Sequence, residues 1–96
     1  MAELLTDQEI ADSLPKLPHW QREGDLLTRT AELASFAKAM EAVNRIAEIA
    51  ESVNHHPDID IRWRKVTFRL TTHSAGGLTA KDVSLAEQID ETIDNL

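Results

Sequence analysis

The sequence contains no cysteine, which excludes disulfide bonds, thiolate metal sites and a cysteine nucleophile. It has no apolar run near the roughly 18 residues that a membrane-spanning helix needs, and no signal-peptide pattern opens the chain. Basic residues are few: Lys and Arg number 10 against 17 Asp and Glu, which gives a net charge of −7. We therefore expect a cytoplasmic protein that binds neither membranes nor nucleic acid directly.

What the sequence does contain is a series of helical and strand-like segments within 96 residues, which predicts a single domain over residues 1–96. Capping residues at Thr6, Ser35 and Thr79 mark helix starts, and Pro15 ends the first helix. The expected elements are, in order, a helix over 7–14, strands over 19–22 and 26–33, a helix over 36–53, strands over 59–63 and 66–71, and a helix over 80–93. This order, α-β-β-α-β-β-α, predicts an α+β fold in which a four-stranded antiparallel sheet has its helices packed on one face.

The helix expected over 36–53 has a wide apolar face. Its apolar residues recur every three or four positions, in a stripe of Phe36, Met40, Val43, Ala47 and Ala50 that is widened by Ile46, Ile49 and Val53. We expect this face to cover the sheet and still to leave an edge for a partner helix, so that the chain forms a homodimer or a homotetramer. Asn54 is expected to cap the helix, and Pro57 prevents its continuation.

Histidines mark the two outer ends of the second predicted hairpin. His55 and His56 precede its first strand, His73 follows its second strand, and the turn between the strands is expected at Arg64 and Lys65. In an antiparallel hairpin the two outer ends meet, so the three imidazoles would share one pocket. Because imidazole has an unperturbed pKa of about 6.5, it gives and takes protons near neutrality. The arrangement therefore indicates a proton-transfer site.

Each histidine taken alone also has an ordinary explanation. His55 and His56 fit a helix C-terminus, where a cationic ring interacts favourably with the helix dipole, and His73 fits an exposed strand end. Three histidines can hold zinc, but the sequence has no His-x-x-x-His or His-x-His pair, so no metal is expected. Glu51 lies one helical turn before His55, where it is either an orienting group for that ring or a solvated helix residue.

The stretch 55–90 reads HHPDIDIRWRKVTFRLTTHSAGGLTAKDVSLAEQID and resembles the signature of the pterin-4a-carbinolamine dehydratase family. The likeness includes the His-His-Pro at 55–57, the Thr-His at 72–73 and the Gly-Gly-Leu-Thr at 76–79. It implies the fold expected above and the loss of water from a 4a-hydroxytetrahydropterin to give a quinonoid dihydropterin. In that family the step recycles the pterin cofactor of aromatic amino acid hydroxylases, and it needs no cofactor of its own.

The resemblance also implies which residues form the site. His55, His56 and His73 match the family's three active-site histidines and Glu51 matches its nearby acidic residue, so these four are the catalytic candidates. The substrate-binding candidates are Asn54, Pro57, Trp20 and Trp63, of which Asn54 stands where some members have Asp and Trp63 where others have Tyr. The usual role of Trp is in the core, and either tryptophan could also stack on a flat heterocycle.

The same resemblance leaves a second function open, that of a binding module. One vertebrate relative is a dimerisation partner of a homeodomain transcription factor through its long helix, and other relatives of this fold are assembly factors with a degraded site. The intact set of three histidines in this chain favours the enzyme, with a small-molecule pterin as its substrate.

Overall fold

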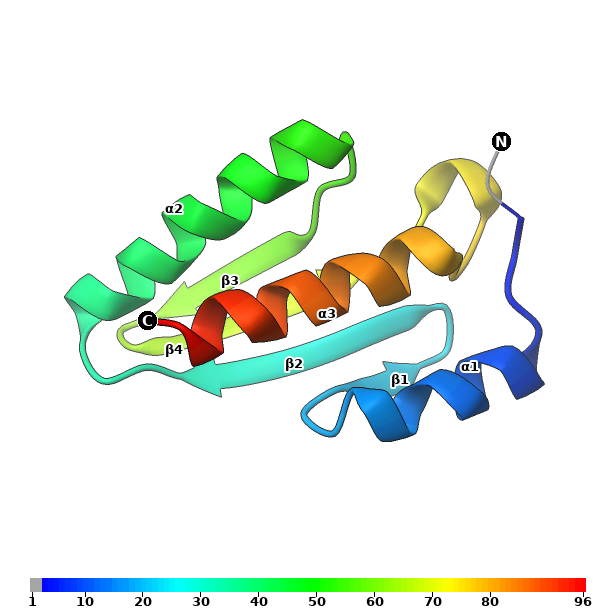
Figure 1. Ribbon diagram of the computed structural model, residues 1–96, viewed down its shortest axis with the longest axis horizontal. Helices are drawn as coiled ribbons and strands as arrows, with labels where there is room; N and C mark the ends of the chain where they lie inside the picture. The colour runs from blue at the N-terminus through cyan, green and yellow to red at the C-terminus, as the bar shows by residue number, and fades with distance from the viewer. Residues whose placement is uncertain (1–2) are drawn as a thin grey trace.

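Helices and strands follow one another in the predicted order in the structure, a computed structural model that describes residues 3–96 (Figure 1). The elements are α1 (Asp7–Ser13), β1 (Gln21–Glu23), β2 (Leu26–Glu32), α2 (Phe36–Val53), β3 (Asp58–Arg62), β4 (Lys65–Leu70) and α3 (Ala80–Asp94). Two short 3-10 helices, η1 (Leu14–Lys16) and η2 (His73–Ala75), follow α1 and β4. The predicted α+β class is confirmed.

The four strands form one antiparallel sheet in the order β1-β2-β4-β3, so that β2 and β4 join the two hairpins at its centre. On the helix side of the central strands the side chains of Leu27, Val66, Phe68 and Leu70 are fully buried. Their neighbours along the strands, such as Thr30 and Thr67, point to the opposite face, where their hydroxyl groups share a hydrogen bond of 2.8 Å. The helices therefore cover one face and leave the other open.

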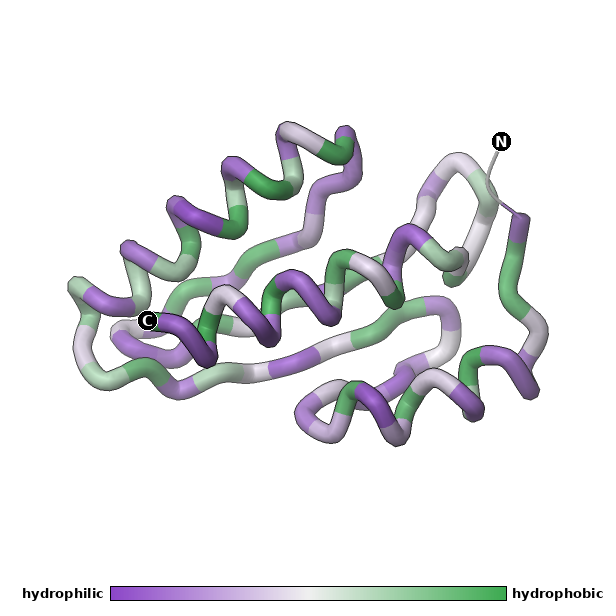
Figure 2. The backbone as a smooth tube through the Cα atoms, viewed as in Figure 1, coloured by the Kyte–Doolittle hydropathy of each residue, from purple (hydrophilic) through white to green (hydrophobic). Residues whose placement is uncertain are grey.

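The buried stripe of α2 overlaps the apolar face predicted from the sequence, which included Ile46 and Ala50, but it is centred away from Phe36. The residues that α2 buries are Ala39, Ala42, Ile46 and Ala50, whereas Phe36 is 51% exposed. Because the apolar residues span about half of the helix circumference, periodicity alone could not choose the buried stripe. The backbone of α2 approaches that of α3 closely, and Figure 2 shows hydrophobic residues along the inner side of α2 and hydrophilic ones along its outer side.

The predicted helix boundaries are confirmed where they rest on capping chemistry. Thr6 accepts a hydrogen bond from the Glu9 amide while the Glu9 carboxylate accepts one from the Thr6 amide. Asn54 ends α2 in the left-handed conformation with φ 51° and ψ 44°. None of the helices within residues 3–96 combines the length and the hydropathy needed to cross a bilayer.

The turn of the second hairpin lies one residue earlier than expected. Arg62 pairs with Lys65, so the turn residues are Trp63 and Arg64, and the predicted turn at Arg64 and Lys65 is wrong. Trp63 takes a φ of 57° and is 70% exposed, and its ring lies 4.9 Å from the Arg64 guanidinium carbon. Because Trp is a strand former, the alternation predicted that Trp63 would continue β3.

Candidate active site

The C-terminus of α2 sends two consecutive histidines in different directions. Asn54 takes the left-handed conformation, and the amide of His55 donates to the carbonyl of Ala50 at 3.1 Å. Beyond this cap the chain is no longer helical, so the two side chains diverge: His55 is buried and His56 is exposed. A single cap therefore creates two different imidazole environments from adjacent residues.

His55 is held by a carboxylate from another helix, 27 residues further along the chain. Its Nε2 lies 2.6 Å from Oδ1 of Asp82, which is fully buried in the first turn of α3. Because a carboxylate can only accept, Nε2 carries the hydrogen and Nδ1 is the ring nitrogen left for another partner. The contact therefore fixes both the orientation of the ring and the nitrogen that is available.

Asp82 is itself fully engaged. Its Oδ2 accepts from the amide of Thr79 at 2.9 Å and from the hydroxyl of Thr72 at 2.8 Å. Since Thr72 gives its hydrogen to Asp82, the 2.8 Å contact between the two threonine hydroxyls is a hydrogen bond donated by Thr79. The side-chain oxygens of Asp82, Thr72 and Thr79 all take part in hydrogen bonds, so these three side chains are held rigidly.

Only one of the two roles of Asp82, that of a helix cap, could be predicted from the sequence. Thr79 and Asp82 have the spacing of an acidic capping box, and the structure confirms it. The same carboxylate also binds His55, and sequence reasoning missed this contact because the two residues lie on different helices. An acidic residue at the third position of a helix start is a general signal for a cap, not for a histidine partner.

Glu51 contacts the second histidine, not the first. Its Oε2 lies 2.5 Å from Nε2 of His56, and both side chains are exposed. The expectation that Glu51 would orient His55 is wrong, because it assumed helical spacing up to residue 55. The left-handed Asn54 ends the helix one residue too early for that geometry.

His73 lies at the same end of the sheet as the histidine pair. The pairing of Asp58 with Arg69 brings together the segments that precede β3 and follow β4. His73 opens η2 with an exposed side chain, directly after the Thr72 that hydrogen-bonds to Asp82. Within residues 3–96 its ring makes no hydrogen bond or ion pair, so the chain leaves both of its nitrogens available.

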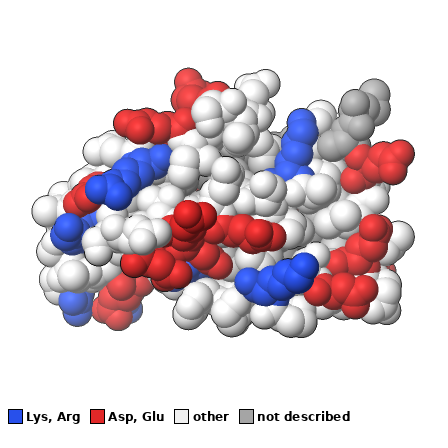
Figure 3. Space-filling model, viewed as in Figure 1, with Lys and Arg blue, Asp and Glu red and all other residues white. Residues whose placement is uncertain are grey.

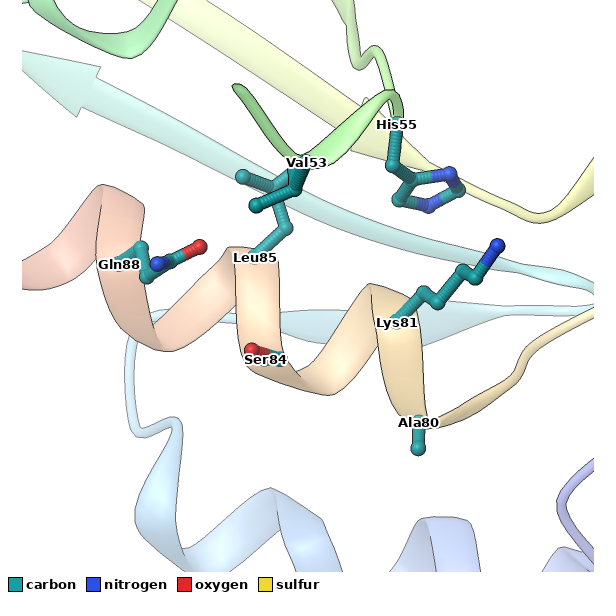
Figure 4. Close-up of a pocket in the computed structure, with 7 residues that line it drawn as sticks. All are labelled: Val53, His55, Ala80, Lys81, Ser84, Leu85 and Gln88. Atoms are coloured by element: carbon teal, nitrogen blue, oxygen red, sulfur yellow. The ribbon is translucent and has the colours of Figure 1, made fainter. Parts of the chain in front are cut away.

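A cavity of about 270 Å³ opens beside His55, between the end of α2 and the first half of α3. Figure 4 shows the His55 ring and the Lys81 side chain on one side of it. Its lining is mostly apolar and comprises Val53, His55, Ala80, Lys81, Ser84, Leu85 and Gln88. His56 and His73 do not line this cavity, so the single pocket expected for all three imidazoles is not formed there within one chain.

The structure does not bring the two tryptophans to the histidines. Trp20 is 5% exposed in the core, where its indole N–H donates to Oδ1 of Asp90 at 2.7 Å, beside an ion pair between Arg29 and Asp90. Trp63 stands at the turn of the β3–β4 hairpin, at the opposite end of these strands from His55. Their predicted part in substrate binding therefore has no support from the geometry of one chain.

The two remaining substrate-binding candidates adjoin the histidines. Asn54 and Pro57 flank the pair along the chain, with Asn54 exposed and Pro57 half-buried. A metal centre has no support, since the described part of the chain holds no group of three or more His, Asp or Glu side chains that could bind an ion. The arrangement is suited to moving protons, because two imidazoles are each paired with a carboxylate and a third is free.

Comparison with known proteins bears on what this site does. Residues 3–92 match the family model described as pterin 4 alpha carbinolamine dehydratase. A protein of Nocardia farcinica named "Putative pterin-4-alpha-carbinolamine dehydratase" is 60% identical over 93% of this chain and 94% of its own. One of the same name from Roseiflexus castenholzii is 55% identical over 97% of this chain and 100% of its own.

Solved structures show the same architecture. The crystal structure of a transcriptional coactivator/pterin dehydratase from Brucella melitensis superimposes with a TM-score of 0.90 at 28% identity, over 93% of this chain and 97% of that one. A pterin dehydratase-like protein identified as a RuBisCO assembly factor has a TM-score of 0.64 at 19% identity, over 77% of this chain and 86% of its own, and shares the fold alone. The family match spans nearly the whole sequence, and the chain therefore belongs to the pterin 4 alpha carbinolamine dehydratase family.

Proposed function

We propose that this protein is a cytoplasmic dehydratase that removes water from a 4a-hydroxytetrahydropterin and releases a quinonoid dihydropterin, as a step in pterin cofactor recycling. The observation that carries the proposal is the buried pair of His55 and Asp82 beside an apolar cavity. A histidine whose Nε2 is fixed by a carboxylate presents Nδ1 for proton transfer, as a general acid–base catalyst requires. The membership of the chain in the family supports the same reaction.

The reaction needs proton transfers at two positions of the substrate. The lone pair of the neighbouring ring nitrogen, N5, forms a double bond to C4a while the C4a–O bond breaks. The departing oxygen takes a proton from a general acid and leaves as water, and a base removes one N–H proton from the ring. Since the elimination changes no oxidation state, no redox cofactor takes part.

We assign the proton transfers to the three histidines. His55 and His73 are the acid candidates: His55 is held by Asp82 beside the apolar cavity, and both ring nitrogens of His73 are without a partner within the described residues. His56, paired with Glu51, is assigned to binding the pterin and to returning the proton. General acid–base catalysis of this kind contributes about 10²–10⁴-fold to the rate.

We propose further that the protein works as a homo-oligomer. Phe36 is half-exposed at the start of α2, and Met40, Val43 and Ala47 continue the same side of that helix at helical spacing. An apolar stripe of this kind on a helix that already packs against the sheet is typical of a helix–helix interface. The alternative function, a dimerisation or assembly factor, would use the same stripe but would not require the histidines.

The assay follows ultraviolet absorbance during dehydration of a synthetic 4a-hydroxytetrahydropterin. We expect the wild-type protein to accelerate the loss of water and His73→Ala to lower turnover by at least about 10-fold. Because His73 is exposed, that substitution should change the free energy of unfolding by less than about 0.5 kcal/mol.

His19→Ala is the matched control, since His19 is also an exposed histidine but precedes β1, away from the site. It should keep full activity. A wild-type protein that does not accelerate the dehydration would rule out the dehydratase and leave the binding module. Full activity of His73→Ala would remove that residue from the mechanism.

A further inference from the structure

Lys81 occupies an unusual position beside His55. It is the second residue of α3, its side chain lines the same cavity as the His55 ring, and Figure 4 shows the two side chains near each other. Within residues 3–96 the Lys81 ammonium group makes no ion pair and no hydrogen bond, although the chain carries 17 acidic residues. The described residues therefore provide no partner for this charge.

The position is also electrostatically unfavourable for a lysine. The first turn of a helix carries the positive end of the helix dipole, which disfavours a cation there. Lys81 is exposed, and its neighbours in the cavity lining are the apolar Val53, Ala80 and Leu85 and the polar His55, Ser84 and Gln88, none of which hydrogen-bonds to its ammonium group. Acidic side chains gather instead over the far half of α3, as Figure 3 shows, where Glu87, Glu91 and Asp94 are exposed. Lys81 thus faces the cavity with its hydrogen-bonding capacity free.

The chemistry of the proposed substrate supplies a partner for this cation. A pterin carries a carbonyl oxygen on C4, the carbon next to C4a, so the oxygen that leaves and the 4-oxo oxygen project from adjacent ring atoms. A ligand that presents its C4a oxygen to His55 therefore brings the 4-oxo oxygen into the same cavity. A lysine ammonium is a strong donor to such an oxygen, and a ring bound in the cavity would cover the exposed Lys81 side chain and displace the water around it.

We propose that Lys81 is a substrate-binding residue that donates a hydrogen bond to the 4-oxo oxygen and thereby selects 4-oxopterins over 4-aminopteridines. When the ring loses its N–H proton, electron density moves onto the 4-oxo oxygen, and the ammonium group stabilises it there. A 4-amino group presents N–H donors at that place, which an ammonium group cannot accept. The inference rests on the proposed dehydratase function and adds its substrate class and a further residue.

The test compares Lys81→Met with Lys81→Arg. Met keeps the length and apolar stem of the side chain and removes the charge, whereas Arg restores a cationic donor. We expect Lys81→Met to lower kcat/KM for the synthetic 4a-hydroxytetrahydropterin at least tenfold, and Lys81→Arg to recover most of the loss. Lys16→Met is the control, because Lys16 is an exposed lysine in η1 that does not line the cavity, and it should keep full activity.

A binding measurement separates this inference from the dehydratase itself. Titration calorimetry with 7,8-dihydropterin and with 2,4-diamino-7,8-dihydropteridine, which differ only at position 4, should show that the wild-type protein prefers the 4-oxo compound at least tenfold and that Lys81→Met loses most of this preference. An active wild-type protein whose Lys81→Met variant keeps both its kcat/KM and its preference would overturn the inference and leave the dehydratase intact. A wild-type protein without dehydratase activity would overturn both.

Discussion

At the scale of single residues, one carboxylate performs two tasks. Oδ2 of Asp82 closes the capping box of α3 through the Thr79 amide, and Oδ1 holds His55. Since both oxygens belong to one rigid group, the start of α3 and the orientation of the His55 ring are coupled. The buried Thr72 hydroxyl adds a third contact and connects the group to the end of β4, one residue before His73.

Substitution of Asp82 separates the two tasks. In Asp82→Asn the amide oxygen can still accept from Thr72 and Thr79, provided that the amide nitrogen turns to His55. The ring must then accept at Nε2 and carry its hydrogen on Nδ1, which reverses the arrangement of the wild-type protein. We expect kcat to fall about 10²–10⁴-fold with a loss of about 1 kcal/mol in the free energy of unfolding.

The measurements are steady-state kinetics, thermal denaturation and the ¹⁵N NMR signals of the His55 ring, which report which nitrogen carries the hydrogen. Asp82→Ala serves as the comparison: it leaves the buried donors of Thr72 and Thr79 unpaired and should cost about 2–4 kcal/mol. If Asp82→Asn kept the wild-type ring signals and full activity, Asp82 would be a helix cap and not a positioning residue.

The residues of the site differ in how far the sequence could predict them. His55, His56 and His73 stand out because their side-chain chemistry is rare in the chain, and the hairpin pairing brings their segments to one end of the sheet. The partner of His55 could not be predicted, because Asp82 reaches it from another helix at a separation of 27 residues. Such contacts depend on how α2 and α3 pack, which local patterns do not encode.

At the scale of elements, the end of α2 decides where the histidines point. Asn54 adopts the left-handed conformation, a position that Gly and Asn occupy far more readily than other residues. Its amide donates to carbonyls of the last turn, those of Ala50 and Glu51, and the chain leaves the helix axis there. The cap therefore separates the buried His55 from the exposed His56.

Two substitutions at Asn54 test this account. Asn54→Ala should lower the free energy of unfolding by about 1 kcal/mol, because a Cβ atom without a compensating polar group disfavours the left-handed conformation. For a chain of this size that corresponds to a fall of about 4–8 °C in Tm. Asn54→Gly should leave Tm unchanged or slightly higher, since Gly adopts that conformation without strain.

The same pair of variants reports on the predicted contact of Asn54 with the substrate. Both remove the carboxamide, so a rise in KM shared by Asn54→Ala and Asn54→Gly would come from a lost substrate contact. Equal melting temperatures for the two variants would contradict the capping account.

Capping chemistry and alternation predicted the elements well, and the errors have physical causes. The helix boundaries at Thr6, Asn54 and Thr79 depend on hydrogen bonds between residues close in sequence, so these boundaries could be predicted from the sequence. The hairpin turn was misplaced because Trp63 has the propensity of a strand residue but takes a left-handed turn conformation. The buried side of α2 was predicted in part: Ile46 and Ala50 are buried as expected, but the buried stripe also takes in Ala39 and Ala42 while the large Phe36 remains half-exposed.

At the scale of the whole molecule, α2 presents an apolar side that residues 3–96 cover only in part: Met40 and Val43 are half-buried against the core, whereas Phe36 and Ala47 are exposed. Ala39, Ala42 and Ile46 are fully buried in the core, and α3 lies beside α2 (Figure 1). The stripe that begins at Phe36 and ends at Ala47 lies about a quarter turn away from the buried residues, as 100° per residue requires. A second copy of α2 packed against it would bury this stripe by ridges-into-grooves contact.

This arrangement predicts that the protein sediments as a dimer or larger assembly and that Phe36→Ser weakens the assembly. Burying a Phe side chain contributes about 1.5–3 kcal/mol, so its loss from an interface should raise the dissociation constant at least about tenfold. Analytical ultracentrifugation over a concentration series measures the change. Glu48→Ser, on the polar side of the same helix, should leave the dissociation constant unchanged. Because Phe36 is half-exposed in the single chain, the monomer of Phe36→Ser should remain folded, and a variant that sediments like the wild-type protein would place the interface elsewhere.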